Sequence, residues 1–226
     1  MIQALEQVLQ VDPGHLTETV GGEPRSAPPE AILPGAGALQ SVLREMNLHY
    51  TSQRRRLMVH DTTVIGADRR ELQCTTRQVV RAEVDGVDRW DIVVAPESGQ
   101  QSRVEPIAGM ELGECRPVPG SDIVVVEALL PRPLARGEVH YTEPRTVYGE
   151  GGEPCTNLGR LISNPTDLVV MEVHFQGETP QRLYRRHINA DAVEVAVDQE
   201  LPLAQGRASL VLAPPRLGGH LVEREW

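Results

Sequence analysis

The seven histidines have the widest chemical range in this chain, because a neutral imidazole can bind a metal ion or move a proton. No two of them stand at the spacing of a zinc finger or of an HExxH helix. Glu172 and His174 share one face of a predicted strand, and His140 or His187 could lie on neighbouring strands. A solvated strand face explains this pattern more simply than a metal-binding cluster does. The sequence therefore predicts no metal site and no cofactor.

The sequence also gives no sign of a catalytic nucleophile or of a phosphate-binding loop. The sequence contains no GxSxG elbow, and none of its cysteines stands in a context that predicts a lowered pKa. The densest group of glycines, Gly149 to Glu153, carries two carboxylates and no lysine, so it would repel a phosphate. We expect a non-catalytic protein with no catalytic residues, although an enzyme whose site leaves no linear motif stays open.

Arginine supplies the concentrations of charge that could bind a partner, with a smaller second cluster at Arg182, Arg185 and Arg186. All 22 basic residues are arginine. The predicted meander becomes more basic than the chain as a whole through Arg54, Arg55, Arg56, Arg69, Arg70, Arg77, Arg81 and Arg89. Arg77 and Arg81 share the polar side of one predicted strand, and Arg89 follows on the next. These three arginines are the candidate surface for a partner or ligand. The alternative is a solvated face on which the arginines pair with neighbouring carboxylates.

The strands that would position these arginines are predicted by alternation. From Leu72 to Val84 apolar and polar residues alternate, as in a strand with one buried and one exposed face. Asp85-Gly86 is typical of a two-residue hairpin turn, and a further strand follows from Val87. With a strand at 57–65, these segments predict a three-stranded antiparallel meander that needs a cover on its apolar face.

The rest of the chain continues in short strands. Leu39, Val42, Leu43 and Met46 predict one amphipathic helix, and 96–121 and 149–166 read as loops, with a weak strand near 103–107. Further strands are expected at 122–130, 139–148, 168–175, 183–188, 193–197, 207–212 and 220–226. The predicted fold is mainly β, an antiparallel β-sandwich, immunoglobulin-like or related, with a short N-terminal helical segment.

Three regions are expected along the chain. Residues 1–20 carry a helical stripe, residues 21–37 form a linker rich in proline and glycine, and residues 38–226 form the β-sandwich domain. A net charge of −10 makes the chain a poor binder of nucleic acid. Three cysteines without CxxC spacing, together with the absence of a signal peptide or membrane-spanning segment, predict a cytoplasmic protein with reduced thiols.

The first residues also carry a family resemblance. The run Ala4-Leu5-Glu6-x-Val8-Leu9-x-Val11-x-Pro13-Gly14-His15-Leu16 resembles the end of a lambda-repressor-like (XRE-type) helix-turn-helix domain of actinobacterial transcriptional regulators. The segment from Arg77 to Arg89, the turn Pro-Leu-Ala-Arg-Gly-Glu and the terminal Trp226 are similar to the same group. The helices that would read DNA are missing from the sequence, so the resemblance implies a regulator's sensory, dimerisation or partner-binding region without direct DNA binding.

The leading hypothesis is therefore a cytoplasmic interaction, effector-binding or dimerisation module related to these regulators. It would bind a protein partner or a second copy of itself, with no membrane involved, for example through an exposed sheet edge. Two alternatives stay open: a structural or assembly subunit of a larger complex, and a β-sandwich that binds a small ligand or sugar or acts as an enzyme.

Overall fold

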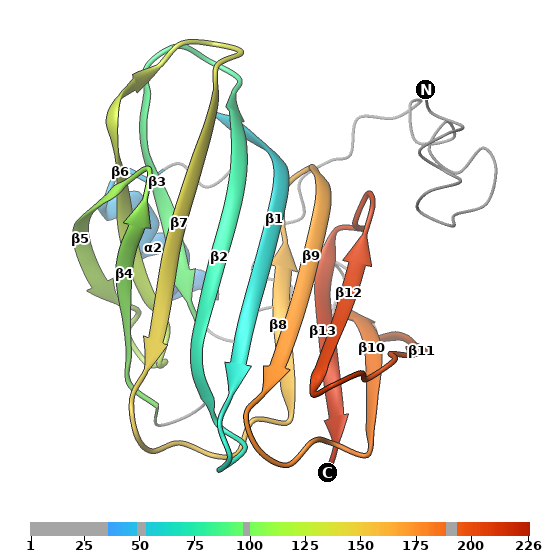
Figure 1. Cartoon of the computed structure of the whole chain (residues 1–226). Helices are drawn as coiled ribbons and strands as arrows, with labels where there is room; N and C mark the ends of the chain where they lie inside the picture. The colour runs from blue at the N-terminus through green and yellow to red at the C-terminus, as the bar shows by residue number, and fades with distance from the viewer. Residues whose placement is uncertain (1–35, 49–52, 97–99, 189–193) are drawn as a thin grey trace, which may run out of the picture.

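The computed structural model describes residues 36–48, 53–96, 100–188 and 194–226, and within these ranges the chain forms one helix and thirteen strands (Figure 1). The elements are α2 (Ala36–Glu45), β1 (Arg54–Ile65), β2 (Glu71–Ala82), β3 (Val87–Val94), β4 (Ser102–Ala108), β5 (Glu111–Pro117), β6 (Val124–Leu134), β7 (Val139–Tyr148), β8 (Asn157–Ile162), β9 (Thr166–Phe175), β10 (Arg182–Ile188), β11 (Glu194–Glu200), β12 (Arg207–Leu212) and β13 (Gly218–Glu225). The mainly β fold of packed antiparallel sheets confirms the predicted class.

The largest sheet has six strands in the order β12-β9-β1-β2-β7-β4. Its neighbours are antiparallel except β1 and β9, which are parallel and join segments more than a hundred residues apart. Alternation gives this sheet two distinct faces. The face that carries Val59 and Val80 is buried and is called the inner face here, whereas the face that carries His60 and Arg77 is only partly buried and is called the outer face.

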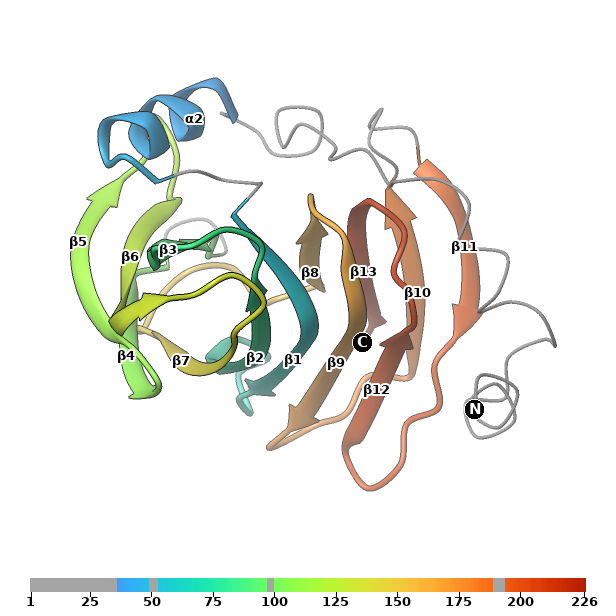
Figure 2. The ribbon, with the colours of Figure 1, turned by 90° about the horizontal axis from the view of Figure 1, so that it is seen from above.

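Two smaller sheets lie side by side on the inner face (Figure 2). The four-stranded sheet, β11-β10-β13-β8, shares with β1, β9 and β12 an aliphatic core that includes Val169, Leu210 and Val222. The three-stranded sheet, β3-β6-β5, packs on β2 through a second core around Trp90. The predicted amphipathic helix is present as α2, and Leu39 and its apolar neighbours cover the other side of the three-stranded sheet.

The predicted meander is wrong in its third strand. β1 and β2 do form an antiparallel hairpin, and Gly86 has the positive φ of 85° that a turn requires. However, β3 pairs with β6 and not with β2, since both sides of β2 are already taken by β1 and β7. The chain crosses between layers at this turn, where the Gly86 N–H donates to Leu134 O and the Ala82 N–H donates to Glu138 O.

Two strands lie in segments that the sequence analysis read as loops. β5 falls within 96–121 and β8 within 149–166. Both are edge strands, which tolerate residues such as Gly113 and Pro117 because one side of the strand makes no ladder hydrogen bonds. The helix begins at Ala36, two residues before the predicted domain boundary. The region 1–20 and most of the predicted linker lie outside the described residues, and no described helix is both long and apolar enough to cross a bilayer.

Candidate functional site

The two small sheets do not pair with each other, and a cleft separates them. β3 is the edge strand of one sheet and β8 is the edge strand of the other (Figure 2). Between them lies a cavity of about 380 Å³, within the size range of ligand pockets. Its two walls include five consecutive residues of each edge, Asp91–Ala95 and Asn157–Leu161. Since side chains of a strand alternate between faces, a wall of consecutive residues means that the strand's edge, with its backbone, borders the cleft.

The floor of the cleft is the inner face of β1, β2 and β7, and it is polar where the two flanking cores are aliphatic. Asp61 lies at its centre and is 6% exposed. Its carboxylate accepts a hydrogen bond from Thr76 Oγ1 at 2.6 Å and one from Arg160 Nη1 of β8 at 3.3 Å. This contact connects the floor to the wall. Thr63, Cys74 and Thr146 complete the polar strip.

A second polar group closes one end of the cleft. Tyr148 hydrogen-bonds with Glu71, and burial, with the added negative charge of Glu71, holds the pKa of the Tyr148 hydroxyl well above its usual value. Glu71 Oε1 also lies 3.2 Å from Cys155 Sγ, which a guanidinium nitrogen of Arg224 contacts from the other side. These contacts link Tyr148, Glu71, Cys155 and Arg224 into one polar group at the cleft.

The cleft thiol is not a nucleophile. Burial raises the pKa of Cys74 to about 12, and the nearby Asp61 carboxylate adds to this effect. Because the reactive species is the thiolate, Cys74 is protonated and inert at neutral pH. The floor therefore offers hydrogen-bond donors and acceptors for binding. Among the described residues, no group of three histidine, cysteine, aspartate or glutamate side chains is placed to hold a metal ion.

Two acidic residues of the cleft, Asp61 and Asp91, are compensated by arginines. Asp91 on β3 forms an ion pair with Arg54 at 3.5 Å, and both side chains are at most 10% exposed. The Arg54 guanidinium also stacks over the Trp90 ring, 4.8 Å from its centroid. Asp61 has Arg160 as its ionic partner. These two carboxylates thus add no unpaired charge to the cleft.

The predicted arginine surface is divided between two sheets. Arg77 and Arg81 lie on the outer face of β2, as expected, but Arg89 lies on β3 in the three-stranded sheet. Arg77 pairs with Glu143 at 3.1 Å, Arg81 with Glu83 at 2.9 Å, and Arg89 with Asp88 and Glu127 at 3.1 and 2.9 Å.

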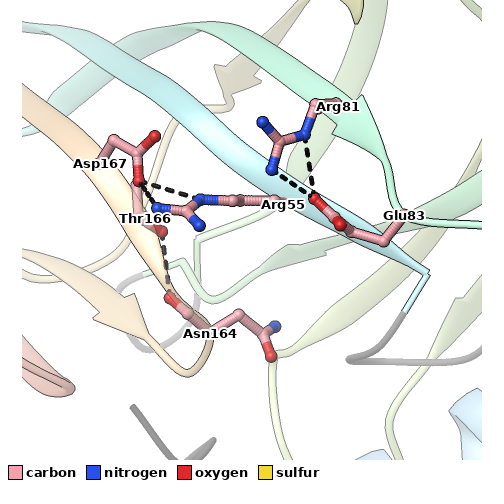
Figure 3. Close-up of polar contacts among 6 residues, drawn as sticks. All are labelled: Arg55, Arg81, Glu83, Asn164, Thr166 and Asp167. Carbon is pink, nitrogen blue, oxygen red and sulfur yellow. Dashed lines mark hydrogen bonds and ion pairs between the residues drawn. The ribbon is translucent and has the colours of Figure 1, made fainter. Parts of the chain in front are cut away.

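Figure 3 shows the same arrangement at one end of the outer face, where cross-strand neighbours Arg55 and Arg81 each turn to a separate carboxylate, Asp167 and Glu83. Thr166 beside Asp167 donates to the backbone oxygen of Asn164. The arginines of this face are thus engaged in local ion pairs. Their placement matches the alternative of a solvated, charge-paired face, and their role in binding a partner stays a prediction.

The five histidines of the described ranges lie in three separate places. Glu172 and His174 do share the outer face, with His174 Nε2 3.9 Å from Glu172 Oε2. A histidine that was not predicted there, His60, lies closer, with its Nε2 2.9 Å from the same oxygen. His140 faces inward, with its Nε2 2.6 Å from Gly109 O, and His187 stacks on His220 in the four-stranded sheet.

Sequence reasoning did not single out Asp61 or Arg160. A signal existed for Asp61, because it stands on the inward parity of β1 between Val59 and Ile65, where a charged residue is unexpected. Arg160 lies in a segment read as a loop, so its approach to the cleft was not predictable.

No protein-family model matches the chain, and no curated protein matches it significantly. A solved structure does share its fold. A provisionally assigned protease from Parabacteroides distasonis is 11% identical over 78% of this chain and 41% of its own, with a TM-score of 0.50. An M1 zinc metallopeptidase from Deinococcus radiodurans is 14% identical over 77% and 43%, with a TM-score of 0.40.

The chain therefore spans less than half the length of the solved structures it matches. At 11% identity, the likeness to the Parabacteroides protein shows the fold alone. The expectation that the chain is non-catalytic stays a prediction.

Proposed function

We propose that this chain is a non-catalytic interaction module that takes part of a partner molecule into the cleft between β3 and β8. The observation that carries the proposal is the polar floor around Asp61, which is open to the cleft although it lies between two aliphatic cores. Buried polar groups are costly unless they are satisfied, so a polar strip at this depth favours a binding role.

The absence of catalytic power is part of the proposal. The cleft thiol is protonated, and Asp61 is engaged by Thr76 and Arg160, so neither is poised as a nucleophile or base. Incubation of the purified chain with fluorogenic peptides should release no product. A turnover that disappears in an Asp61→Asn variant would contradict this part of the proposal and favour an enzyme.

Binding can be tested without knowing the natural partner. A displayed library of random heptapeptides would be selected on the purified chain, and the enriched peptides would be assayed on two variants. Ile92→Trp places a bulky ring at the wall of the cleft, whereas Val211→Trp changes a site on β12 that is 51% exposed and away from the cleft. We expect the first change to weaken binding at least tenfold and the second to leave it unchanged. Equal binding by both variants, or no enriched peptide, would refute a binding role for the cleft.

The comparison favours a second candidate role, as one domain of a larger protein, because the fold recurs in a solved protein more than twice as long as the matched part. In that case the partner is another domain of the same polypeptide. A relationship to XRE-type regulators, cytoplasmic location and dimerisation remain predictions, since the main motif behind the resemblance lies in residues 1–20, outside the described ranges.

A further inference from the structure

Each wall of the cleft is the edge of a sheet, where backbone N–H and C=O groups can accept a further strand. Among the described strands, β3 pairs only with β6 and β8 only with β13, so each has one side without a ladder to another described strand. In an antiparallel pair, alternate residues direct their N–H and C=O groups toward the partner and the others direct them away. Asp91–Ala95 and Asn157–Leu161 thus present outward-pointing backbone groups to the same cavity.

These two edges lack the protection found at two other edges of the molecule, those of β4 and β5. β4, at the edge of the large sheet, contains Pro106 next to a register shift, and β5, at the far edge of the three-stranded sheet, ends in Pro117 after a register shift. Proline and bulges are the usual devices that prevent a sheet from adding another strand. The cleft-lining parts of β3 and β8 contain neither a proline nor a register shift.

We propose that an extended peptide segment of a partner enters the cleft as an added strand and hydrogen-bonds through its backbone to the edges of β3 and β8. The inference rests on the proposed function and specifies its mode of recognition. Strand addition is an established way for a sheet to bind a peptide, with affinity from main-chain hydrogen bonds and selectivity from alternate side chains. Five residues line each wall, which corresponds to a strand of roughly 17 Å.

The cleft floor defines which side chains fit on the inward positions of that strand. Asp61 and Asp91 already have arginine partners, and the remaining floor groups include the hydroxyls of Thr63 and Thr76. A charged side chain placed beside Asp61 or Asp91 would lose its hydration and meet only a carboxylate that is already paired. The segment should therefore carry uncharged small polar or β-branched residues, such as threonine and valine, at alternate positions. Charged residues fit only on the positions that point away from the floor.

The decisive experiment uses the heptapeptides selected on the chain, each synthesised in three forms: unmodified, N-methylated at odd positions and N-methylated at even positions. N-methylation removes the amide donor and leaves the side chains in place. If the peptide pairs as a strand, at least one modified form should bind tenfold or more weakly, since several backbone hydrogen bonds are lost. Full affinity of both modified forms would overturn strand addition. If the unmodified peptide remains sensitive to Ile92→Trp, the proposed binding role of the cleft still stands.

Hydrogen exchange of the chain with and without the unmodified peptide provides the second readout. Amides in Asp91–Ala95 or Asn157–Leu161 should gain protection, whereas those of the β12 edge, Arg207–Leu212, should not. Protection confined to β12, or protection of neither cleft edge, would contradict the proposal even if the peptide binds.

Discussion

Arg160 Nη1 lies 3.3 Å from both carboxylate oxygens of Asp61, so a single ion pair joins the edge strand β8 to the floor of the large sheet. The two residues are 99 positions apart in the chain. The Asp61 side chain is 8% exposed and that of Arg160 is 25% exposed. Because the pair is largely withdrawn from water, removal of one partner leaves the other charge poorly compensated. The contact therefore stabilises the position of the cleft wall as well as its floor.

An Asp61→Asn substitution should lower the free energy of unfolding by about 1–3 kcal/mol, less than for a fully buried pair because Arg160 retains some solvent. Urea denaturation measures this loss. The matched control is Asp167→Asn, which removes the partner of Arg55 on the outer face, where both side chains are more than 40% exposed, and should cost less than about 1 kcal/mol. Equal losses in the two variants would show that the Asp61 pair has no special role. The double variant Arg160→Met/Asp61→Asn, compared with the two single variants, measures the coupling energy between the two side chains.

His220 provides a pH dependence whose sign is determined by its burial. Loss of hydration lowers the pKa of His220 from 6.5 to about 4, against the opposing effect of its hydrogen bond to Arg216 O, and the neighbouring His187 lowers it further. The folded state therefore favours the neutral imidazole. Above pH 6.5 this contribution to stability is complete, and it is lost as the pH falls from 6.5 to 4, because the unfolded chain takes up the proton first.

Between pH 6.5 and pH 4 the shift in the pKa of His220 would lower the free energy of unfolding by about 3 kcal/mol. We expect urea midpoints to fall over this pH window, and the fall to be smaller in a His220→Phe variant, which keeps a ring stacked on His187 without a titrating group. The comparison between the two pH profiles is the measurement, because groups remote from His220 contribute equally in both proteins. Parallel profiles would contradict the assignment to His220.

The strands and their faces were largely predictable from the sequence, but their partners were not. Alternation correctly placed Val80 inward and Arg77 outward on β2, because side-chain direction is a local property of a strand. Pairing is decided by the whole sheet, so β3 could leave β2 for β6 with no change in its own pattern. Edge strands such as β8 were missed because glycine and nearby proline have little cost where a strand has only one neighbour.

The cleft was harder to predict than the fold. It exists because two small sheets cover one large sheet without meeting, which no local pattern encodes. Asp61 could have been suspected from its inward parity, but its partner Arg160 could not, since only the packed sheets bring the two together. The same holds for His60 and Glu172, which are 112 residues apart and become neighbours only through the parallel pairing of β1 and β9.

The three cysteines should differ sharply in reactivity. Cys115 is exposed, Cys155 is fully buried, and the Cys74 thiol has a pKa of about 12 although part of the residue remains accessible. Iodoacetamide at pH 8 should therefore alkylate Cys115 in the native protein and leave Cys74 unmodified, because the thiolate is the attacking species. Mass spectrometry of tryptic peptides identifies the sites. Labelling in urea, where all three should react, is the control, and rapid native alkylation of Cys74 would contradict its protonated state.

Replacement of Arg77, Arg81 and Arg89 together by alanine distinguishes a binding surface from a solvated one. Their side chains are 38%, 38% and 46% exposed, and each has a carboxylate within 3.1 Å. Exposed pairs of this kind contribute little, so the unfolding free energy should fall by less than about 2 kcal/mol in total. Because none of the three lines the cleft, the selected heptapeptides should bind the variant within twofold of their original affinity, as measured by fluorescence anisotropy. A tenfold loss of affinity in a folded variant would contradict this prediction. It would show that the arginines take part in binding, with residues from both sheets forming one surface.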